Sequence, residues 1–233
     1  LATRTRELST EQVPHVSPAE IYEKAKKQHD QNLQRLLIVE DNDELRNYLT
    51  HTLSDNYTIQ TCSNGKEALT IVKEYMPELI ISDIMMPEMR GDELCAAIKN
   101  DIETSHIPII LLTALNDEKN ILEGLKIGAD EYIVKPFNIG ILKATIANLL
   151  TNRALLKSKY ANLEVSEEEE VSPNCATDLD WKFIATVKKS VEENIDNPAF
   201  NVDVLCNLLN MSRTSFYNKL KALTDQAPAD YIR

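Results

Sequence analysis

The 233-residue chain lacks most features that would indicate a secreted, membrane-embedded or metal-cluster protein. Its cysteines have no paired spacing, so we expect reduced thiols instead of a disulfide framework. Its histidines are scattered and form no metal-binding cluster. No apolar stretch approaches the ~20 residues that a membrane-spanning helix needs, and the N-terminal residues resemble neither a signal peptide nor a transit peptide. We therefore expect a cytoplasmic protein, with no membrane contact within this sequence.

An excess of basic residues is absent as well. The formal net charge is −12, and residues 180–233 carry seven Lys/Arg and seven Asp/Glu. Composition therefore gives no indication of nucleic-acid binding, which has to be argued from a motif. The 43% hydrophobic content suffices for one ordinary domain and a smaller one. Because the chain begins with Leu1, we interpret it as a piece of a longer protein.

The sequence does contain a regular alternation of short apolar runs and amphipathic stretches between residues 35 and 152. The apolar runs predict buried parallel strands at 36–40, 57–61, 79–82, 108–112 and 131–134. The amphipathic stretches predict helices at 43–53, 65–75, 92–100, 118–127 and 139–152. This alternation favours right-handed crossovers, so we predict an α/β fold with a doubly wound, five-stranded parallel sheet. Residues 1–34 predict a linker with a short helix, and residues 153–179 an acidic linker.

Polar groups follow directly after four of the predicted strands. Glu40 and Asp41 follow the first strand, Asp83 the third, Thr113 the fourth and Lys135 the fifth. Because the reactive groups of such sheets lie at the carboxyl ends of the strands, we expect these side chains to share one pocket. Three carboxylates, a hydroxyl and an ammonium suit Mg²⁺-assisted transfer of a phosphoryl group to an aspartate.

Each residue type has a chemical reason in such a pocket. The expected Mg²⁺ ligands are Asp41, Asp83, the backbone carbonyl of Met85 and, through a bound water, Glu40. Neighbouring carboxylates raise one another's pKa, so the cation would keep Asp83 ionised as the nucleophile. The Lys135 ammonium and the Thr113 hydroxyl would face the transferred group, whose oxygens carry the charge.

Four segments, LLIVEDND, LIISDIMMPEMRGDEL, IPIILLTA and GADEYIVKPF, resemble the receiver domain of bacterial two-component response regulators. The resemblance covers about residues 35–152 and implies the strand order 2-1-3-4-5. It implies that a histidine kinase, in the same polypeptide or another, phosphorylates Asp83, and that Lys135 pairs with the phosphoryl group. It further implies that Thr113 and Tyr132 switch position together, and that the Lys135–Pro136 bond is cis.

A different class of protein also fits part of the pattern. Asp41-Asn42-Asp43 after an apolar strand resembles the first motif of haloacid-dehalogenase phosphatases, which use an Asp, a strand-end Thr and a Lys. Two features count against this enzyme: Asp83 ends an intermediate strand, and no Gly-Asp with a nearby Asp follows Lys135. The two classes differ in turnover, because a phosphatase releases phosphate repeatedly and a receiver takes up one phosphoryl group.

The C-terminal residues predict a small all-α module. Helical patterns at 202–209 and 213–223 have helix-turn-helix form, with Ser212 as the N-cap of the second helix and Asn210 in a left-handed turn. The apolar residues expected to pack the pair are Val204, Leu205, Leu208, Met211, Phe216 and Leu220. The side chains expected to point outward and reach DNA are Arg213, Thr214, Tyr217, Asn218 and Lys221.

The segment NMSRTSFYNKLKALTDQAPADYIR resembles the first half of an AraC-type DNA-binding domain, which we place at residues 180–233. Asp225 stands where that family has Gly, so we expect a non-glycine residue with positive φ. Only one helix-turn-helix unit is present, so we expect weak DNA binding by this chain. Together, the two resemblances indicate the C-terminal part of a hybrid two-component protein of gut Bacteroidetes.

These resemblances imply a phosphorylation-controlled transcriptional regulator that accepts a phosphoryl group and is not a conventional enzyme. One hypothesis is that phosphorylation creates a homodimer through the face around Thr113 and Tyr132. A second hypothesis is that phosphorylation of the receiver relieves inhibition of the helical module by releasing it. A further alternative is that the receiver acts only through protein–protein contacts.

Overall fold

The computed structural model describes residues 33–114, 128–161, 177–197 and 199–231. The predictions for residues 1–32, the helix at 118–127 and most of the acidic linker lie outside these residues. Gln34–Arg233 forms one compact unit. Among the described helices, none is long and apolar enough to cross a membrane.

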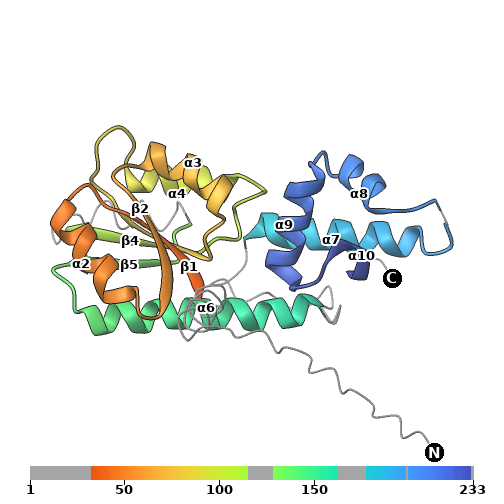
Figure 1. Cartoon of the computed structure of the whole chain (residues 1–233). Helices are drawn as coiled ribbons and strands as arrows, with labels where there is room; N and C mark the ends of the chain where they lie inside the picture. The colour runs from red at the N-terminus through yellow and green to blue at the C-terminus, as the bar shows by residue number, and fades with distance from the viewer. Residues whose placement is uncertain (1–32, 115–127, 162–176, 198, 232–233) are drawn as a thin grey trace, which may run out of the picture. The chain divides into compact units, whose positions relative to one another are not determined.

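The sheet has the predicted topology. Its strands are β1 (Gln34–Val39), β2 (Tyr57–Cys62), β3 (Leu79–Asp83), β4 (Ile109–Ala114) and β5 (Glu131–Lys135). All neighbours pair in parallel, in the order β2-β1-β3-β4-β5, as Figure 1 shows. The fold prediction and its strand order are therefore confirmed.

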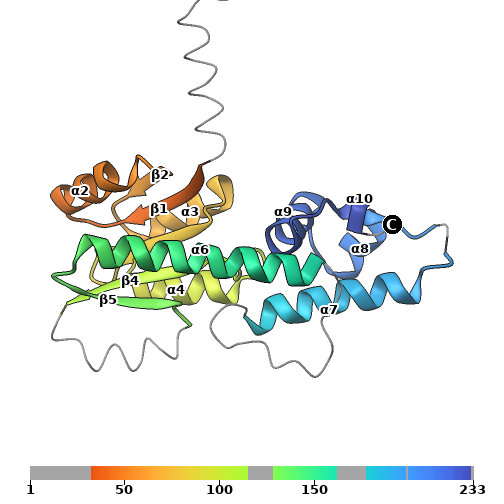
Figure 2. The ribbon, with the colours of Figure 1, turned by 90° about the horizontal axis from the view of Figure 1, so that it is seen from below.

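Helices cover both faces of this sheet (Figures 1 and 2). The helices of this part are α2 (Asp43–Leu53), α3 (Gly65–Tyr75), α4 (Gly91–Asn100) and α6 (Ile139–Ala161). On one face, Leu37 and Ile80 pack with Val72 of α3 and Leu94 of α4. On the other face, the alternate strand residues pack with α2 and α6. Because successive strand side chains point to opposite faces, two apolar cores enclose the sheet and leave its edge of strand ends for polar groups.

Local sequence signals explain where the helices begin. Asn42 caps α2 by accepting a hydrogen bond from the Leu45 N–H, and Asn64 caps α3 in the same way. The helix predicted over 139–152 continues to Ala161, because residues 153–161 contain no proline or glycine that would end it.

The C-terminal module consists of α7 (Asp178–Glu193), α8 (Val202–Leu208), α9 (Arg213–Thr224) and the short α10 (Pro228–Tyr231). Phe183, Leu205, Phe216 and Leu220 form its core. Ser212 caps α9 through the Ser215 N–H. Asn210 and Asp225 both have positive φ, of 53° and 60°, as predicted.

The predicted packing of α8 was wrong at two positions. Val204 and Leu208 are 37% and 60% exposed, and both lie outside the buried core of the module. They are spaced four residues apart, so they share a face of α8. Leu205 and Cys206 face α9 instead.

Candidate functional site

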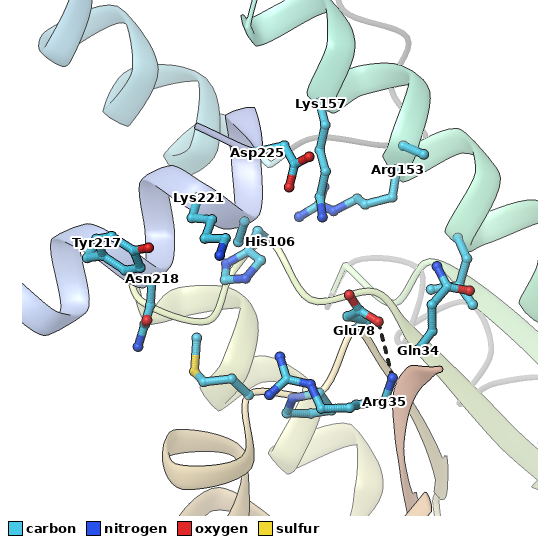
Figure 3. A pocket seen from close by; sticks show the side chains of 15 residues that line it. Gln34, Arg35, Glu78, His106, Arg153, Lys157, Tyr217, Asn218, Lys221 and Asp225 are labelled. Carbon is cyan, nitrogen blue, oxygen red and sulfur yellow. Dashed lines mark hydrogen bonds between the residues drawn. The ribbon is translucent and has the colours of Figure 1, made fainter. Parts of the chain in front are cut away.

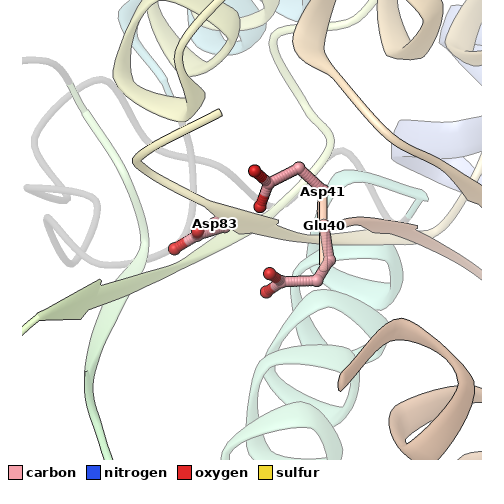
Figure 4. Close-up of side chains that lie close together, drawn as sticks. All are labelled: Glu40, Asp41 and Asp83. Atoms are coloured by element: carbon pink, nitrogen blue, oxygen red, sulfur yellow. The ribbon is translucent and has the colours of Figure 1, made fainter. Parts of the chain in front are cut away.

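Three carboxylates meet at the carboxyl edge of the sheet. Glu40 and Asp41 directly follow β1, and Asp83 ends the neighbouring strand β3. One oxygen from each of the three lies within 4.8 Å of the others (Figure 4). Ligands on opposite sides of Mg²⁺ are about 4 Å apart, since each Mg–O distance is about 2.1 Å. The donor set and its spacing therefore fit a divalent cation, with Asp41 exposed toward solvent and Glu40 and Asp83 buried.

Lys135, at the end of β5, reaches across the sheet edge to the same carboxylates. Its Nζ lies 2.8 Å from Glu40 Oε2 and 3.0 Å from Asp83 Oδ1. A second donor, the backbone N–H of Ile84, is 2.9 Å from the same Asp83 oxygen. Both contacts use Oδ1, so they orient the carboxylate and leave Oδ2 for reaction.

Burial and the neighbouring charges together set the pKa of Glu40. Its side chain is almost inaccessible to water, and burial raises its pKa, as does the charge of Asp83, against the lowering effect of the hydrogen bond from Lys135. The hydrogen bond and the charge of Lys135 therefore oppose the effect of burial on this carboxyl. Lys135 supplies one positive charge, and a metal ion would add to it.

Thr113 and Tyr132 lie on the neighbouring strands β4 and β5. Thr113 is fully buried, and its hydroxyl makes a long, 3.4 Å hydrogen bond to the carbonyl of Ala114. Tyr132 packs against the apolar core that contains α3 and α4. Its buried hydroxyl has no hydrogen-bond partner among the described residues, and burial raises the pKa of Tyr132 to about 12. The Thr113 hydroxyl and the Tyr132 side chain are thus both turned into the protein.

The loop after β3 contains a position that the sequence reasoning missed. Met85, whose carbonyl was predicted as a ligand, lies in this loop and has an exposed side chain. The loop closes when the Gly91 N–H donates to the Ile84 carbonyl, at 3.0 Å. A Cβ atom on Gly91 would lie 2.0 Å from the carbonyl oxygen of Asp83. The available signal was a glycine at the start of a helix, eight residues after Asp83.

The side chains predicted to read DNA do not all face open solvent. Tyr217, Asn218 and Lys221 of α9 line a cavity together with residues of β1, α6 and the connection to β3 (Figure 3). Thr214 lines a second, smaller cavity that it shares with residues after α4. Arg213 lies 3.4 Å from Asp203 in an exposed ion pair. The predicted recognition face of α9 therefore borders the α/β part of the chain, but Arg213, Thr214, Tyr217 and Lys221 stay exposed and Asn218 is half-buried.

A buried polar cluster connects the two parts of the chain beside this cavity. Lys219 and Asp180 are both fully buried and form an ion pair. The Ser105 hydroxyl lies 2.9 Å from Asp180 Oδ1 and 2.8 Å from Lys219 Nζ. Burial alone would raise the pKa of Asp180, but the charges of Lys219 and of Arg153, 3.6 Å away, lower it to about 2. Burial lowers the pKa of Lys219 to about 8, so both groups are charged at pH 7.

Comparison with known families gives a clear result for the α/β part. Residues 36–147 match the model of the response regulator receiver domain. A crystal structure of a response regulator from Chloroflexus aurantiacus is 30% identical and has a TM-score of 0.50. The similarity covers 52% of this chain and 99% of that one.

Two curated relatives extend the comparison. Histidine kinase P4 of Formosa agariphila is 42% identical over 198 residues, which are 85% of this chain and 14% of that protein. The transcriptional regulator ycf27 of Guillardia theta is 42% identical over 128 residues, covering 54% of this chain and 49% of the relative. The chain therefore spans half or less of the length of these relatives.

Proposed function

Because residues 36–147 belong to the family of response regulator receiver domains, we propose that this chain is a phosphorylation-controlled transcriptional regulator. A histidine kinase, in the same polypeptide or another, transfers a phosphoryl group to Asp83, and the modification controls DNA binding by the helical module. The observation that carries this proposal is the convergence of Asp83, Glu40, Asp41 and Lys135 at one sheet edge.

The proposed reaction is a single displacement at phosphorus. The free oxygen of Asp83 bonds to phosphorus, the P–N bond to the donor imidazole breaks, and its electron pair goes to the departing nitrogen. Lys135 stabilises the charge on the phosphoryl oxygens, because its ammonium already lies 3.0 Å from the nucleophilic carboxylate. Mg²⁺, held by Asp41, Asp83, the Met85 carbonyl and, through water, Glu40, would supply further positive charge.

The surroundings of Asp41 and Asp83 favour the receiver function over the phosphatase alternative. In the phosphatase reading, Asp41 would be the nucleophile, yet it is the exposed member of the carboxylate set. Asp83 is instead oriented by two donors through one oxygen. We therefore propose a stoichiometric phosphoacceptor instead of a phosphatase that turns over.

The proposal that the helical module binds DNA is supported by its form and by the relatives. Helices α8 and α9 follow one another with a short connection, as in a helix-turn-helix, and the capped α9 is the proposed recognition helix. The 198 residues aligned with histidine kinase P4 exceed the 112 residues of the receiver match at 36–147, so that similarity extends into the flanking regions. The ycf27 relative is named a transcriptional regulator. A hybrid parent protein with an AraC-type domain remains our proposal for this chain.

The position of α9 favours release as the mode of control. Tyr217, Asn218 and Lys221 line a cavity against the receiver, and Lys219 is buried against Ser105, so the receiver restricts the approach of DNA to this side of α9. We propose that phosphorylation at Asp83 weakens the contact. Dimerisation around Thr113 and Tyr132 is the second proposed mode, and it can follow release.

Beryllofluoride, which mimics a phosphoryl group on aspartate, separates these modes. Size-exclusion mass measurement and hydrogen exchange of α9 are compared with and without beryllofluoride and Mg²⁺, with Asp83→Asn as the control. Release predicts faster exchange in α9 at unchanged mass, whereas dimerisation predicts a doubled mass. An unchanged mass together with unchanged α9 exchange in the wild type would contradict both modes.

A further inference from the structure

The cavity in front of α9 is a second polar site, separate from the carboxylate cluster. It has a volume of about 320 Å³, within the range of small-molecule sites, which begins at about 300 Å³. Its walls come from β1, the connection between α3 and β3, α6 and α9. Figure 3 shows side chains from these separate elements extending into the same space.

Positive charge dominates the lining. Four of the lining side chains are cationic: Arg35, Arg153, Lys157 and Lys221. Two are carboxylates, Glu78 and Asp225, so the lining carries a net charge of +2 in a chain whose net charge is −12. Glu78 already accepts a hydrogen bond from the Arg35 backbone N–H at 3.1 Å. Arg153 lies 3.6 Å from Asp180, and Arg35 Nη1 donates to the Tyr75 carbonyl at 2.8 Å, so Lys157 and Lys221 are the lining cations best placed to attract an added anion.

His106 gives an independent indication of a missing polar partner. Its side chain is buried in the wall of the cavity, and Nδ1 has no hydrogen-bond partner among the described residues. Burial lowers the pKa of His106 well below its usual value, and the positive charges of Lys219, Arg153 and Lys157 lower it further. His106 is therefore a neutral imidazole at pH 7, and a bound anion or its water could supply the partner that Nδ1 lacks among the described residues.

The rest of the lining is apolar. Met76, Leu150, Ala154 and Ala222 contribute to the walls, and the ring of Tyr217 borders the cavity. Such surfaces accept a carbon body or a flat ring instead of a hydrated ion. A DNA duplex is too large for a cavity of about 320 Å³. We propose that this cavity binds a small phosphorylated organic molecule, with its phosphate at Lys157 and Lys221 and its apolar body against Tyr217.

Such a ligand would contact the receiver and α9 at the same time. Arg35 and Lys157 come from receiver elements, and Lys221 comes from α9. Binding would therefore stabilise, by mass action, the arrangement in which α9 lies beside the receiver. This inference adds a ligand input to the chain and does not depend on phosphorylation of Asp83.

Calorimetric titration with AMP, adenosine and inorganic phosphate tests the site. The full 233-residue chain with Asp83→Asn is used without divalent cations, which removes contributions from the carboxylate cluster. AMP is expected to bind at least about tenfold more tightly than either adenosine or phosphate, because it carries both the phosphate for the lysines and the flat ring for the apolar wall. Lys157→Ala and Lys221→Ala should each weaken AMP binding by about tenfold or more, since each removes a charge-assisted contact.

Lys189→Ala is the matched control, because this exposed lysine of α7 lies outside the cavity lining. It should leave AMP binding unchanged. The NMR titration of His106 gives a second readout, since a bound dianion should raise its pKa. The proposal would be overturned if AMP did not bind at ~10 mM or bound all variants with equal affinity. It would also be overturned if inorganic phosphate bound the chain and AMP did not.

Discussion

Replacing Lys219 by Met is predicted to destabilise the C-terminal module strongly. Lys219 is fully buried, and its Nζ contacts Asp180 and the Ser105 hydroxyl. Methionine retains the apolar stem and removes the charge, which leaves the Asp180 carboxylate buried with Ser105 and the more distant Arg153. Breaking a buried ion pair from one side costs about 3–5 kcal/mol. Because Arg153 remains, we expect the lower end, about 3 kcal/mol.

The fluorescence of the single tryptophan reports unfolding of the C-terminal module. Trp181 lies next to Asp180 in α7 and packs against the core of the module, so its fluorescence in a urea titration reports unfolding of this region. Lys189→Met, at an exposed position of α7 outside the cavity lining, is the control and should change the free energy of unfolding by less than about 0.5 kcal/mol.

A double-mutant cycle separates the lost ion pair from other effects. Asp180→Leu alone should also destabilise the module, because it leaves Lys219 buried without its carboxylate. The double variant Asp180→Leu/Lys219→Met should recover about 2 kcal/mol relative to the sum of the single effects. If Lys219→Met unfolds within about 1 kcal/mol of the wild type, or if the cycle shows no coupling, the buried pair does not hold the module as described.

Two further perturbations test the receiver and its boundary with the module. Gly91→Ala should place Cβ against the Asp83 carbonyl oxygen, 2.0 Å away. We expect a loss of about 1–3 kcal/mol in the free energy of unfolding and slower labelling by a phosphodonor. Gly140→Ala, whose nearest neighbour is a side-chain atom at 3.0 Å, should behave like the wild type, and normal labelling of Gly91→Ala would contradict the close approach. His106 has a lowered pKa in the folded state, so protons bind preferentially to the unfolded chain, and stability should fall as the pH decreases below about 6.5. The free energy of unfolding from urea titrations should decrease by up to about 1.4 kcal/mol per pH unit below about pH 6.5, and His106→Gln should reduce the difference between pH 7.5 and 5.5; an unchanged pH dependence in that variant would refute the assignment.

The α/β part could be predicted from the sequence because each of its signals is local. Apolar runs predict buried strands, and the residue after each run predicts the composition of the sheet edge. Asn42 and Asn64 mark helix starts by their own side chains. The position of Glu40, Asp41, Asp83 and Lys135 therefore follows from the strand ends alone.

Contacts between distant segments could not be predicted in this way. Gly91 matters because of the carbonyl of Asp83, and Lys219 because of Ser105, 114 residues earlier in the chain. On α9, Lys219 would have been placed on a polar surface by its residue type. The exposure of Val204 and Leu208 depends likewise on which face of α8 meets α9, and sequence periodicity alone leaves that choice open.

Labelling with a small acyl-phosphate donor tests the central claim most directly. The wild-type chain and Asp83→Asn are incubated with the donor and Mg²⁺, and the covalent phosphate is counted by mass spectrometry of the intact chain. The account predicts one phosphoryl group per wild-type chain, bound as a base-labile acyl phosphate, and none on Asp83→Asn. Equal labelling of the two chains would contradict Asp83 as the acceptor.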